Sequence, residues 1–289
     1  MSPDFIPKDR RQFIKAGAMT LAAASLPAAS DPGVKAPLST DFLKDPKERL
    51  KTFIRIKGSL DNRVVISSLS GCHLGVVDAA AQPLYGVIAA TFQRFRPLAD
   101  GRFEAVSFEI AYFTDLATGK VIDQYRNPYT GETVKVGHAR SKPARLTYHL
   151  DLSFTLTPPI PGFELTHRVR PPVVIGDVLT MGEEGFSVIT APGQKAPFRY
   201  SEVSTLQASL ADLADPAAPT VPARTAYTAV ANWRPWLNMG ARPGHLVGTG
   251  AGVLGITLAD LPAEFLRVTQ ERHPDVLKDP GASLTFPAA

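Results

Sequence analysis

The chain has 289 residues, including 26 prolines, 22 glycines and one cysteine, and its formal net charge is +4. A single cysteine, Cys72, excludes a disulfide scaffold and any multi-cysteine zinc or iron–sulfur site. A hydrophobic fraction of 44% is too high for a disordered chain, and the frequent prolines and glycines favour short strands and turns over a helical bundle.

Residues 1–30 have the pattern of a targeting segment. The stretch 9–15 reads DRRQFIK, which matches a twin-arginine signal: paired arginines, two bulky apolar residues and a lysine. An alanine-rich apolar stretch at 16–26 and small residues before position 31 follow, and this stretch is too short to span a bilayer. We therefore expect export to the periplasm by the twin-arginine route, with residues 1–30 removed.

The remaining chain has the character of one globular domain. Removing residues 1–30 lowers the formal charge from +4 to +2 and leaves no basic stripe, so nucleic acid is not expected as a partner. No later apolar run is long enough for stable membrane insertion, and no pattern indicates an oligomeric state. Residues 31–46 are polar and rich in proline, so we expect a linker there and a single domain over 47–289.

Strand signals recur every 8 to 15 residues along this domain. Residues 47–56 are expected to begin as a helix and pass into a first strand. Further strands are expected at 63–69, 84–95, 103–113, 120–126, 133–139, 144–156, 162–169, 173–181 and 185–190, and helices at 204–213 and 262–271. This pattern predicts a mainly β chain that forms a single antiparallel β-barrel of lipocalin or calycin type with a few short helices.

The strand expected at 103–113 indicates what each of its faces does. Alternate residues of a strand point to opposite faces of the sheet. One set is large and apolar, including Phe108 and Ile110, and is expected to pack under a covering layer. The other contains small residues and Glu109, so we expect it to line a cavity inside the barrel, with Glu109 projecting into that cavity. A solvated face with Glu109 as a surface charge is the alternative.

Residues 112–138 contain two tight turns and a dense group of polar and aromatic side chains. Pro128 and Gly131 suit the corner of the second turn. The group consists of Asp123, Tyr125, Arg126, Asn127, Tyr129, Glu132 and His138. Turn chemistry with an edge ion pair between Arg126 and Glu132 explains single members, whereas the group as a whole indicates a site.

This segment resembles a bacterial family catalogued as domain of unknown function 1838. The resemblance rests on 125–134 (YRNPYTGETV), on 233–240 (WRPWLNMG), and on Leu261-Pro262 followed by Arg272-His273-Pro274, and it covers roughly residues 45–280. The family implies a twin-arginine signal in many members but no established catalytic residues. At Arg126 and Tyr129 many relatives are expected to carry tryptophan, so the shape of a ligand is not implied by the resemblance.

The candidate catalytic residues are a carboxylate, two phenols and an imidazole. Burial raises the pKa of a carboxylic acid toward neutrality, which suits Glu109 as a general base. Tyr112 or Tyr129 would donate a proton or a hydrogen bond to an enolate oxygen, although Glu109 and Tyr112 share a face only if the strand bulges. His138 lies one strand beyond the dense turn and is the candidate acid or base there, with a structural imidazole as the alternative.

Ligand contacts are expected from the same region and from the tryptophan-rich block. The candidate ligand-binding residues are Arg94, Tyr125, Arg126, Asn127, Trp233, Trp236 and Met239. Arg94 would hold a carboxylate or balance Glu109. Trp233, Trp236 and Met239 would close one end of the barrel, form the wall of a hydrophobic pocket, or do both.

The remaining motifs of the sequence do not indicate a metal, nucleotide or nucleophile site. The six histidines lack metal-binding spacing, so no metal site and no cofactor are expected, although distant strands can assemble a three-histidine zinc site. The glycine-rich stretch 250–255 imitates a dinucleotide fingerprint but lacks the βαβ context, so we reject it. Cys72 and His73 are adjacent, so their side chains point to opposite faces of a strand and do not form a nucleophile pair.

Two functions are therefore expected from the sequence. The first is an exported, cofactor-independent enzyme of lyase, isomerase or hydratase type that acts on a small lipophilic or aromatic compound inside the barrel. The alternative is a periplasmic, lipocalin-like carrier of a small hydrophobic ligand. Unpaired ionisable groups inside the cavity favour the enzyme, whereas an apolar lining with one or two polar anchors favours the carrier.

Overall fold

The computed structural model describes residues 40–190 and 196–287. Of these described residues, 47% lie in strands and 16% in helices, so the mainly β expectation is confirmed. The expected signal peptide at 1–30 lies outside the described residues, as does most of the expected linker at 31–46. Within that linker, Asp41–Leu43 forms a short 3-10 helix (η1).

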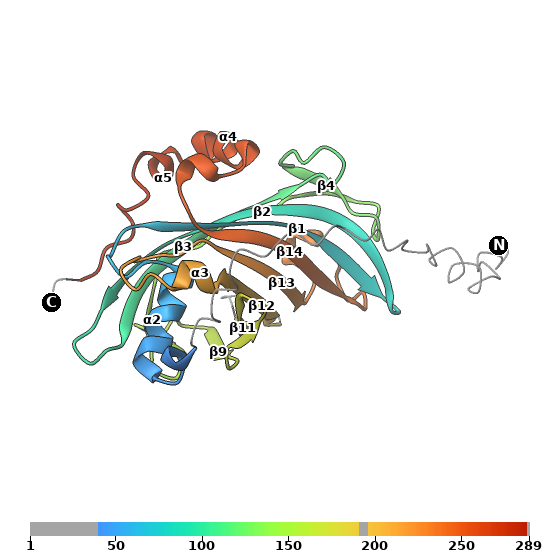
Figure 1. Cartoon of the computed structure of the whole chain (residues 1–289). Helices are drawn as coiled ribbons and strands as arrows, with labels where there is room; N and C mark the ends of the chain where they lie inside the picture. The colour runs from blue at the N-terminus through green and yellow to red at the C-terminus, as the bar shows by residue number, and fades with distance from the viewer. Residues whose placement is uncertain (1–39, 191–195, 288–289) are drawn as a thin grey trace, which may run out of the picture. The chain divides into compact units, whose positions relative to one another are not determined.

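The strands form a nearly closed, ten-strand antiparallel barrel (Figure 1). Around the barrel the order is β10-β11-β12-β13-β14-β1-β2-β3-β7-β8, with β6 paired to β3, β9 paired to β11, and β4–β5 as a separate hairpin. The strands are β1 (Val65–Val77), β2 (Ala80–Pro97), β3 (Phe103–Thr114), β4 (Gln124–Arg126), β5 (Thr133–Lys135), β6 (Ala139–Arg140), β7 (Ala144–Tyr148), β8 (Phe154–Leu156), β9 (Phe163–Val169), β10 (Val173–Ile175), β11 (Val178–Ile189), β12 (Phe198–Ser209), β13 (Ala223–Ala231) and β14 (His245–Ile256).

Two expected elements are wrong. Residues 204–209 belong to β12, because Leu206 and Ala208 alternate with polar residues and pair with β11 and β13 on either side. Helix begins only at α3 (Leu210–Leu213), where the Ser209 hydroxyl accepts a hydrogen bond from Ala211 N. Residues 47–56 do not pass into a strand either, since they all belong to one helix, α2 (Pro46–Lys57).

Helix α2 closes one end of the barrel. Asp45 caps its first turn by accepting a hydrogen bond from Lys47 N at 2.8 Å. The fully buried Leu50, Phe53 and Ile54 pack against inward-facing residues of seven strands, among them Phe103 on β3. These strand residues are Phe95, Phe103, Ala105, Tyr148, Leu179, Met181, Leu206, Ala208, Ala223 and Leu254. Because the plug is apolar, it separates the barrel interior from water at this end.

The two free edges of the sheet meet through side chains. Within the described strands, no backbone pairing joins β8 to β9. The Phe154 ring on β8 instead lies with its centroid 4.2 Å from that of His167 on β9. The wall of the barrel is therefore continuous in packing, although not in hydrogen bonding.

A second layer covers part of the outer face. Helices α4 (Ala263–Arg272) and α5 (Pro274–Lys278) lie on the side of the sheet opposite α2 (Figure 1). Phe265 of α4 packs with Phe108 and Ile110 of β3 in one buried cluster. This is the covering layer expected for the large apolar face of strand 103–113, and α4 matches the helix expected at 262–271.

Candidate functional site

The middle of the barrel contains a polar cavity of about 170 Å³. We use "the chamber" for this cavity, which lies between the α2 plug and the opposite end of the barrel. Its lining comes from β1–β3 and β11–β14, together with Lys57 at the end of α2. The lining residues are Lys57, Ser67, Ser68, Leu69, Ala89, Thr91, Gln93, Glu109, Glu183, Glu202, Ser204, Leu206, Thr225, Tyr227 and Leu254.

Small residues on the inner wall keep the chamber open. On β14 the positions in phase with the inward-facing Leu246 and Leu254 include Gly248, Gly250 and Gly252. A Cβ atom at Gly250 would lie 2.5 Å from the Ser70 carbonyl oxygen and 2.7 Å from the Tyr227 ring. The glycine-rich stretch 250–255 is therefore part of an antiparallel strand that lets Tyr227 lie flat against the wall, which agrees with its rejection as a nucleotide site.

Glu109 and Glu202 are the two carboxylic acids of the chamber that form no direct ion pair, although the charge of Arg234 acts on Glu109 and that of Lys57 on Glu202. Both line the chamber, and neither forms an ion pair with any described residue. Glu109 is an exposed residue whose side chain lines the chamber; its desolvation there, followed by the neighbouring Glu202, raises its pKa, while Arg234 and the Thr91 hydroxyl lower it. Burial also raises the pKa of Glu202, against the hydrogen bond that it accepts from the Tyr200 hydroxyl. Two acids that resist ionisation therefore share one chamber.

A third carboxylate, Glu183, is held in the charged form. Lys57 Nζ donates to both of its oxygens at 2.7 and 2.8 Å, and His167 Nε2 lies 3.2 Å from Oε1. Burial alone would raise the pKa of Glu183, but Lys57 and His167 lower it to about 2. A second hollow of about 260 Å³, between β9, β11 and β12, shares Lys57, Glu183, Glu202 and Ser204 with the chamber.

The depressed pKa of Glu183 predicts a specific loss of stability in acid. The folded carboxyl titrates near pH 2, whereas an unfolded one titrates near 4.3. The stabilisation is therefore complete above about pH 4.5 and is lost as the pH falls toward 2, by on the order of 3 kcal/mol. Urea unfolding between pH 2 and 7 measures this, and Glu183→Gln should remove that part of the slope. An unchanged slope in the variant would contradict the assignment.

Aromatic side chains close the opposite end of the barrel. The β4–β5 hairpin and residues 233–239, which include the short 3-10 helix η2 (Pro235–Leu237), pack there with the inward-facing Tyr85 and Phe113. We call this the aromatic cap. It contains Tyr125, Tyr129, Trp233, Trp236 and Met239, all candidate site residues from the sequence. Trp233 and Trp236 thus help to close one end of the barrel, which is one of their two expected roles.

Asn127 fastens the two parts of the aromatic cap together. Its side chain is fully buried and donates to the Leu237 carbonyl at 2.7 Å and to the Met239 sulfur at 3.2 Å. Its side-chain oxygen accepts a hydrogen bond from Tyr129 N at 2.9 Å. These contacts satisfy the amide completely, so the structure gives Asn127 a packing role and not a free ligand-binding group.

Asn127→Ala is expected to destabilise the protein by about 1–3 kcal/mol, because it leaves the Leu237 carbonyl unpaired in a buried site. Its neighbour Arg126 is exposed, so Arg126→Ala should change the free energy of unfolding by less than about 0.5 kcal/mol. Urea unfolding of the two variants makes the comparison. Equal effects would show that the amide does not hold the aromatic cap.

The structure separates other candidate residues from the chamber. Arg94 lies on the outer face of β2, because it is in phase with Phe92, and it donates to the carbonyls of Asn62 and Leu284. Tyr112 also faces outward, and its hydroxyl lies 3.1 Å from Thr269 Oγ1 under α4. We therefore assign neither residue a role in the chamber, and β3 has no bulge that would turn Tyr112 inward.

His138 lies near Tyr112 rather than near Glu109. Its Nδ1 accepts a hydrogen bond from Phe113 N at 3.1 Å, and its Nε2 lies 3.5 Å from Asp123, which pairs with Arg272. Burial and Arg272 lower the pKa of His138, so the imidazole is neutral near pH 7. This environment matches the structural alternative for His138. The expected dense group is thus divided between the aromatic cap, the surface and the space under α4.

Several residues of the chamber were not singled out in the sequence. Lys57, Glu183, Glu202 and Tyr227 come from four separate elements. An available signal was strand alternation: Tyr200, Glu202, Ser204 and Leu206 share one phase, and an apolar partner in that phase marks the face as inward. Lys57 had no such signal, because a lysine in the last turn of a helix usually reaches solvent.

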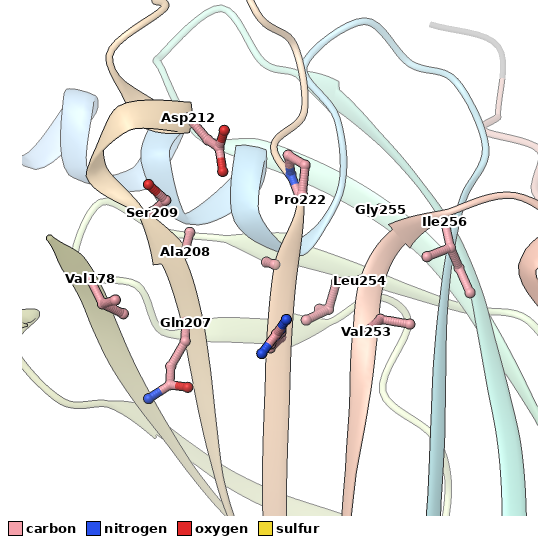
Figure 2. Close-up of a pocket in the computed structure, with 12 residues that line it drawn as sticks. Val178, Gln207, Ala208, Ser209, Asp212, Pro222, Val253, Leu254, Gly255 and Ile256 are labelled. Carbon is pink, nitrogen blue, oxygen red and sulfur yellow. The ribbon is translucent and has the colours of Figure 1, made fainter. Parts of the chain in front are cut away.

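A larger hollow of about 520 Å³ lies outside the chamber. Figure 2 shows it at the α3 end of β11–β14, with Gln207, Asp212 and Val253 among its lining residues. Those three side chains are exposed. Its lining contains one carboxylate, Asp212, and no glutamate, lysine or tyrosine, so the chamber remains the candidate site.

Within residues 40–190 and 196–287, no three histidine, cysteine, aspartate or glutamate side chains gather as a metal-binding group. Over the same ranges, no helix combines the length and the apolar character needed to cross a bilayer.

Comparison with known proteins gives one match. A family model described as "Protein of unknown function (DUF1838)" matches residues 72–286. These residues include β1 from Cys72 onward and most of the chamber, but not α2 and Lys57. No curated protein and no solved structure matches the chain.

Proposed function

The chain belongs to the DUF1838 family, whose function is unknown. From the geometry of the site, we propose that the chamber is the active site of an acid–base enzyme of lyase, isomerase or hydratase type. The observation that carries the proposal is the pair Glu109 and Glu202, two carboxylic acids of raised pKa that line one cavity and form no direct ion pair among the described residues. Acids tuned toward neutral pH serve as general acids and bases, and such tuning is concentrated at functional sites.

The proposed reaction moves one proton within a small lipophilic or aromatic substrate. Glu109, once ionised, removes a proton from a carbon atom, and the electron pair moves toward a neighbouring oxygen or expels a leaving group. The phenol of Tyr227, which lines the same chamber, donates a hydrogen bond to the developing oxyanion. Glu202 gives a proton to the product or the leaving group, and proton exchange through water between turnovers then takes the proton from Glu109 and restores the one on Glu202. No cofactor takes part in this sequence.

The choice between enzyme and carrier rests on the lining. A carrier needs an apolar cavity with one or two polar anchors, whereas this chamber contains three glutamates, a lysine and a tyrosine. The closed ends of the barrel also suit a carrier, which makes that the second candidate. The polar lining favours the enzyme.

One experiment separates the two functions. The purified chain is incubated with a metabolite extract, and the mixture is followed by mass spectrometry. An enzyme depletes a compound in large molar excess over protein and forms a product of altered structure. A carrier retains an unchanged compound at no more than one molecule per chain, and that result would overturn the enzyme proposal.

We also propose export by the twin-arginine route, supported by the residue pattern at 9–15. In a host with that pathway, the chain should accumulate in the periplasm without residues 1–30. Replacing Arg10 and Arg11 together with lysine should leave it in the cytoplasm, whereas Arg49→Lys should not affect export. Immunoblots of cell fractions test this, and periplasmic accumulation of the double variant would refute the proposal.

A further inference from the structure

A half-buried arginine without a direct ion pair lies between the chamber and the aromatic cap, and its charge lowers the pKa of Glu109. The guanidinium carbon of Arg234 is 4.9 Å from the centroid of the Phe113 ring. Its Nε atom is buried and has no hydrogen-bond partner, and its guanidinium forms no ion pair across the described ranges. An arginine in such a site is normally paired, because a charge in a poorly solvated position is costly when alone.

Three more polar atoms around Arg234 lack partners. Tyr85 is fully buried and His73 is 6% exposed, yet neither the Tyr85 hydroxyl nor His73 Nδ1 has a partner in good hydrogen-bond geometry, although the Tyr85 hydroxyl lies close enough to Arg234 for that side chain to lower its pKa. The indole nitrogen of Trp236 is likewise buried and unpartnered. More than nine in ten buried polar groups in proteins are hydrogen-bonded, so four unpartnered atoms in one place require an explanation.

These side chains form one connected cluster. The centroid of the Tyr85 ring lies 5.1 Å from those of His73, Phe113 and Trp236. We call Arg234, Tyr85, His73 and Trp236 the donor cluster, because the unpartnered atoms of the arginine and the tryptophan can only donate and the tyrosine hydroxyl can donate. Burial, followed by Arg234, lowers the pKa of His73 to about 3, so this imidazole is neutral and adds no second charge.

The donor cluster adjoins the chamber through Tyr227. A Cβ atom placed on Gly248 would lie 3.2 Å from His73 Nε2 and 3.5 Å from the Tyr227 ring, so His73 and Tyr227 flank this glycine. Tyr227 in turn lines the chamber with Glu109 and Glu202. A ligand group bound at Arg234 would therefore extend past Tyr227 toward the two carboxylic acids.

We propose that the donor cluster binds the carboxylate of the substrate, so that the substrate is a small lipophilic or aromatic carboxylic acid whose body lies in the chamber. One arginine fork with neutral donors around it matches a singly charged, planar acceptor. The polar atoms are enclosed, so the carboxylate enters with a rearrangement of the Arg234 side chain, which no ion pair holds in the described structure. This assignment rests on the proposed function for the chemistry that follows binding.

The test uses benzoate as the probe and benzamide as its neutral counterpart, each titrated calorimetrically into the full chain. Benzoate should bind more tightly than benzamide. Arg234→Met should weaken benzoate by about tenfold or more, and Tyr85→Phe by a smaller factor. Arg242→Met, at an exposed arginine close by in the chain, should leave the affinity unchanged. Equal binding of the two probes, or unchanged benzoate affinity in Arg234→Met, would overturn the proposal.

A second variant covers the case in which Arg234→Met fails to fold. Arg234→Lys retains the charge but loses the planar fork, so benzoate should bind several-fold more weakly while still being preferred over benzamide. Unchanged affinity in Arg234→Lys would contradict the assignment. The outcomes also separate the two proposals. Benzoate binding through Arg234 without any turnover would support the carboxylate site and contradict the enzyme proposal. Turnover without benzoate binding would support the enzyme and contradict the carboxylate site.

Discussion

Lys57→Met is expected to destabilise the protein by about 3–5 kcal/mol at pH 7, the typical cost of removing one partner from a buried ion pair. Lys57 donates to both oxygens of Glu183, whose side chain is 9% exposed. Methionine retains the volume of the lysine stem but leaves a buried carboxylate with only His167 beside it. Urea unfolding measures the loss.

The same pair predicts how that loss depends on pH and on a second change. Without Lys57, burial dominates at Glu183 and raises its pKa, so the carboxyl becomes neutral on mild acidification. The stability gap between wild type and Lys57→Met should therefore begin to narrow as the pH falls through the raised pKa of the variant's Glu183, and narrow further below about 4.5 as the wild type loses its own stabilisation. Replacing Glu183 with leucine as well should recover most of the loss at pH 7, since an apolar pair needs no partner charge.

Lys51→Met provides the matched control. Lys51 lies on the same helix, but both it and its partner Glu48 are about half exposed, and such surface pairs contribute at most about 1 kcal/mol. If Lys57→Met lowered the free energy of unfolding no more than Lys51→Met does, Glu183 would not be a buried carboxylate that depends on Lys57.

The sequence could predict which face of the sheet a residue occupies wherever the alternation of apolar and polar residues within one strand is enough to define both faces. On 103–114, alternation separates Phe108 and Ile110, which meet α4, from Glu109, which faces the chamber. The periods of strand and helix differ enough that one such stretch defines both faces. At 204–209 a short apolar spacing was compatible with either period, and only the pairing with β11 and β13 settles it as strand.

The composition of the site was harder to predict, because it depends on contacts between distant segments. The dense group at 123–138 has the residue types of a site. In the structure, however, Asn127 donates hydrogen bonds to Leu237 and Met239, and His138 accepts one from Phe113 N. Conversely, Lys57 and Glu183 are unremarkable in their local sequence and meet only when α2 enters the barrel. Burial and pairing are properties of the fold, so local composition alone could not predict which of these residues belong to the chamber.

Glu109→Gln is expected to lower turnover by about 10²–10⁴-fold, the contribution typical of a positioned general base. The amide has nearly the same shape but cannot accept a proton, so the fold should be retained. Because burial and Glu202 raise the pKa of Glu109, the activity of the wild type should increase with pH as this carboxyl ionises. The measurement is turnover against pH on the compound found in the metabolite screen.

Matched variants separate this role from simple changes of charge. Glu164 is exposed on β9, so Glu164→Gln removes the same charge from the surface and should leave turnover unchanged. Glu202→Gln should also reduce turnover but should act on the opposite limb of the pH profile, because its proton is donated rather than accepted. If Glu109→Gln retained full turnover with an unaltered profile, the base would have to be another group and the chamber chemistry proposed here would fail.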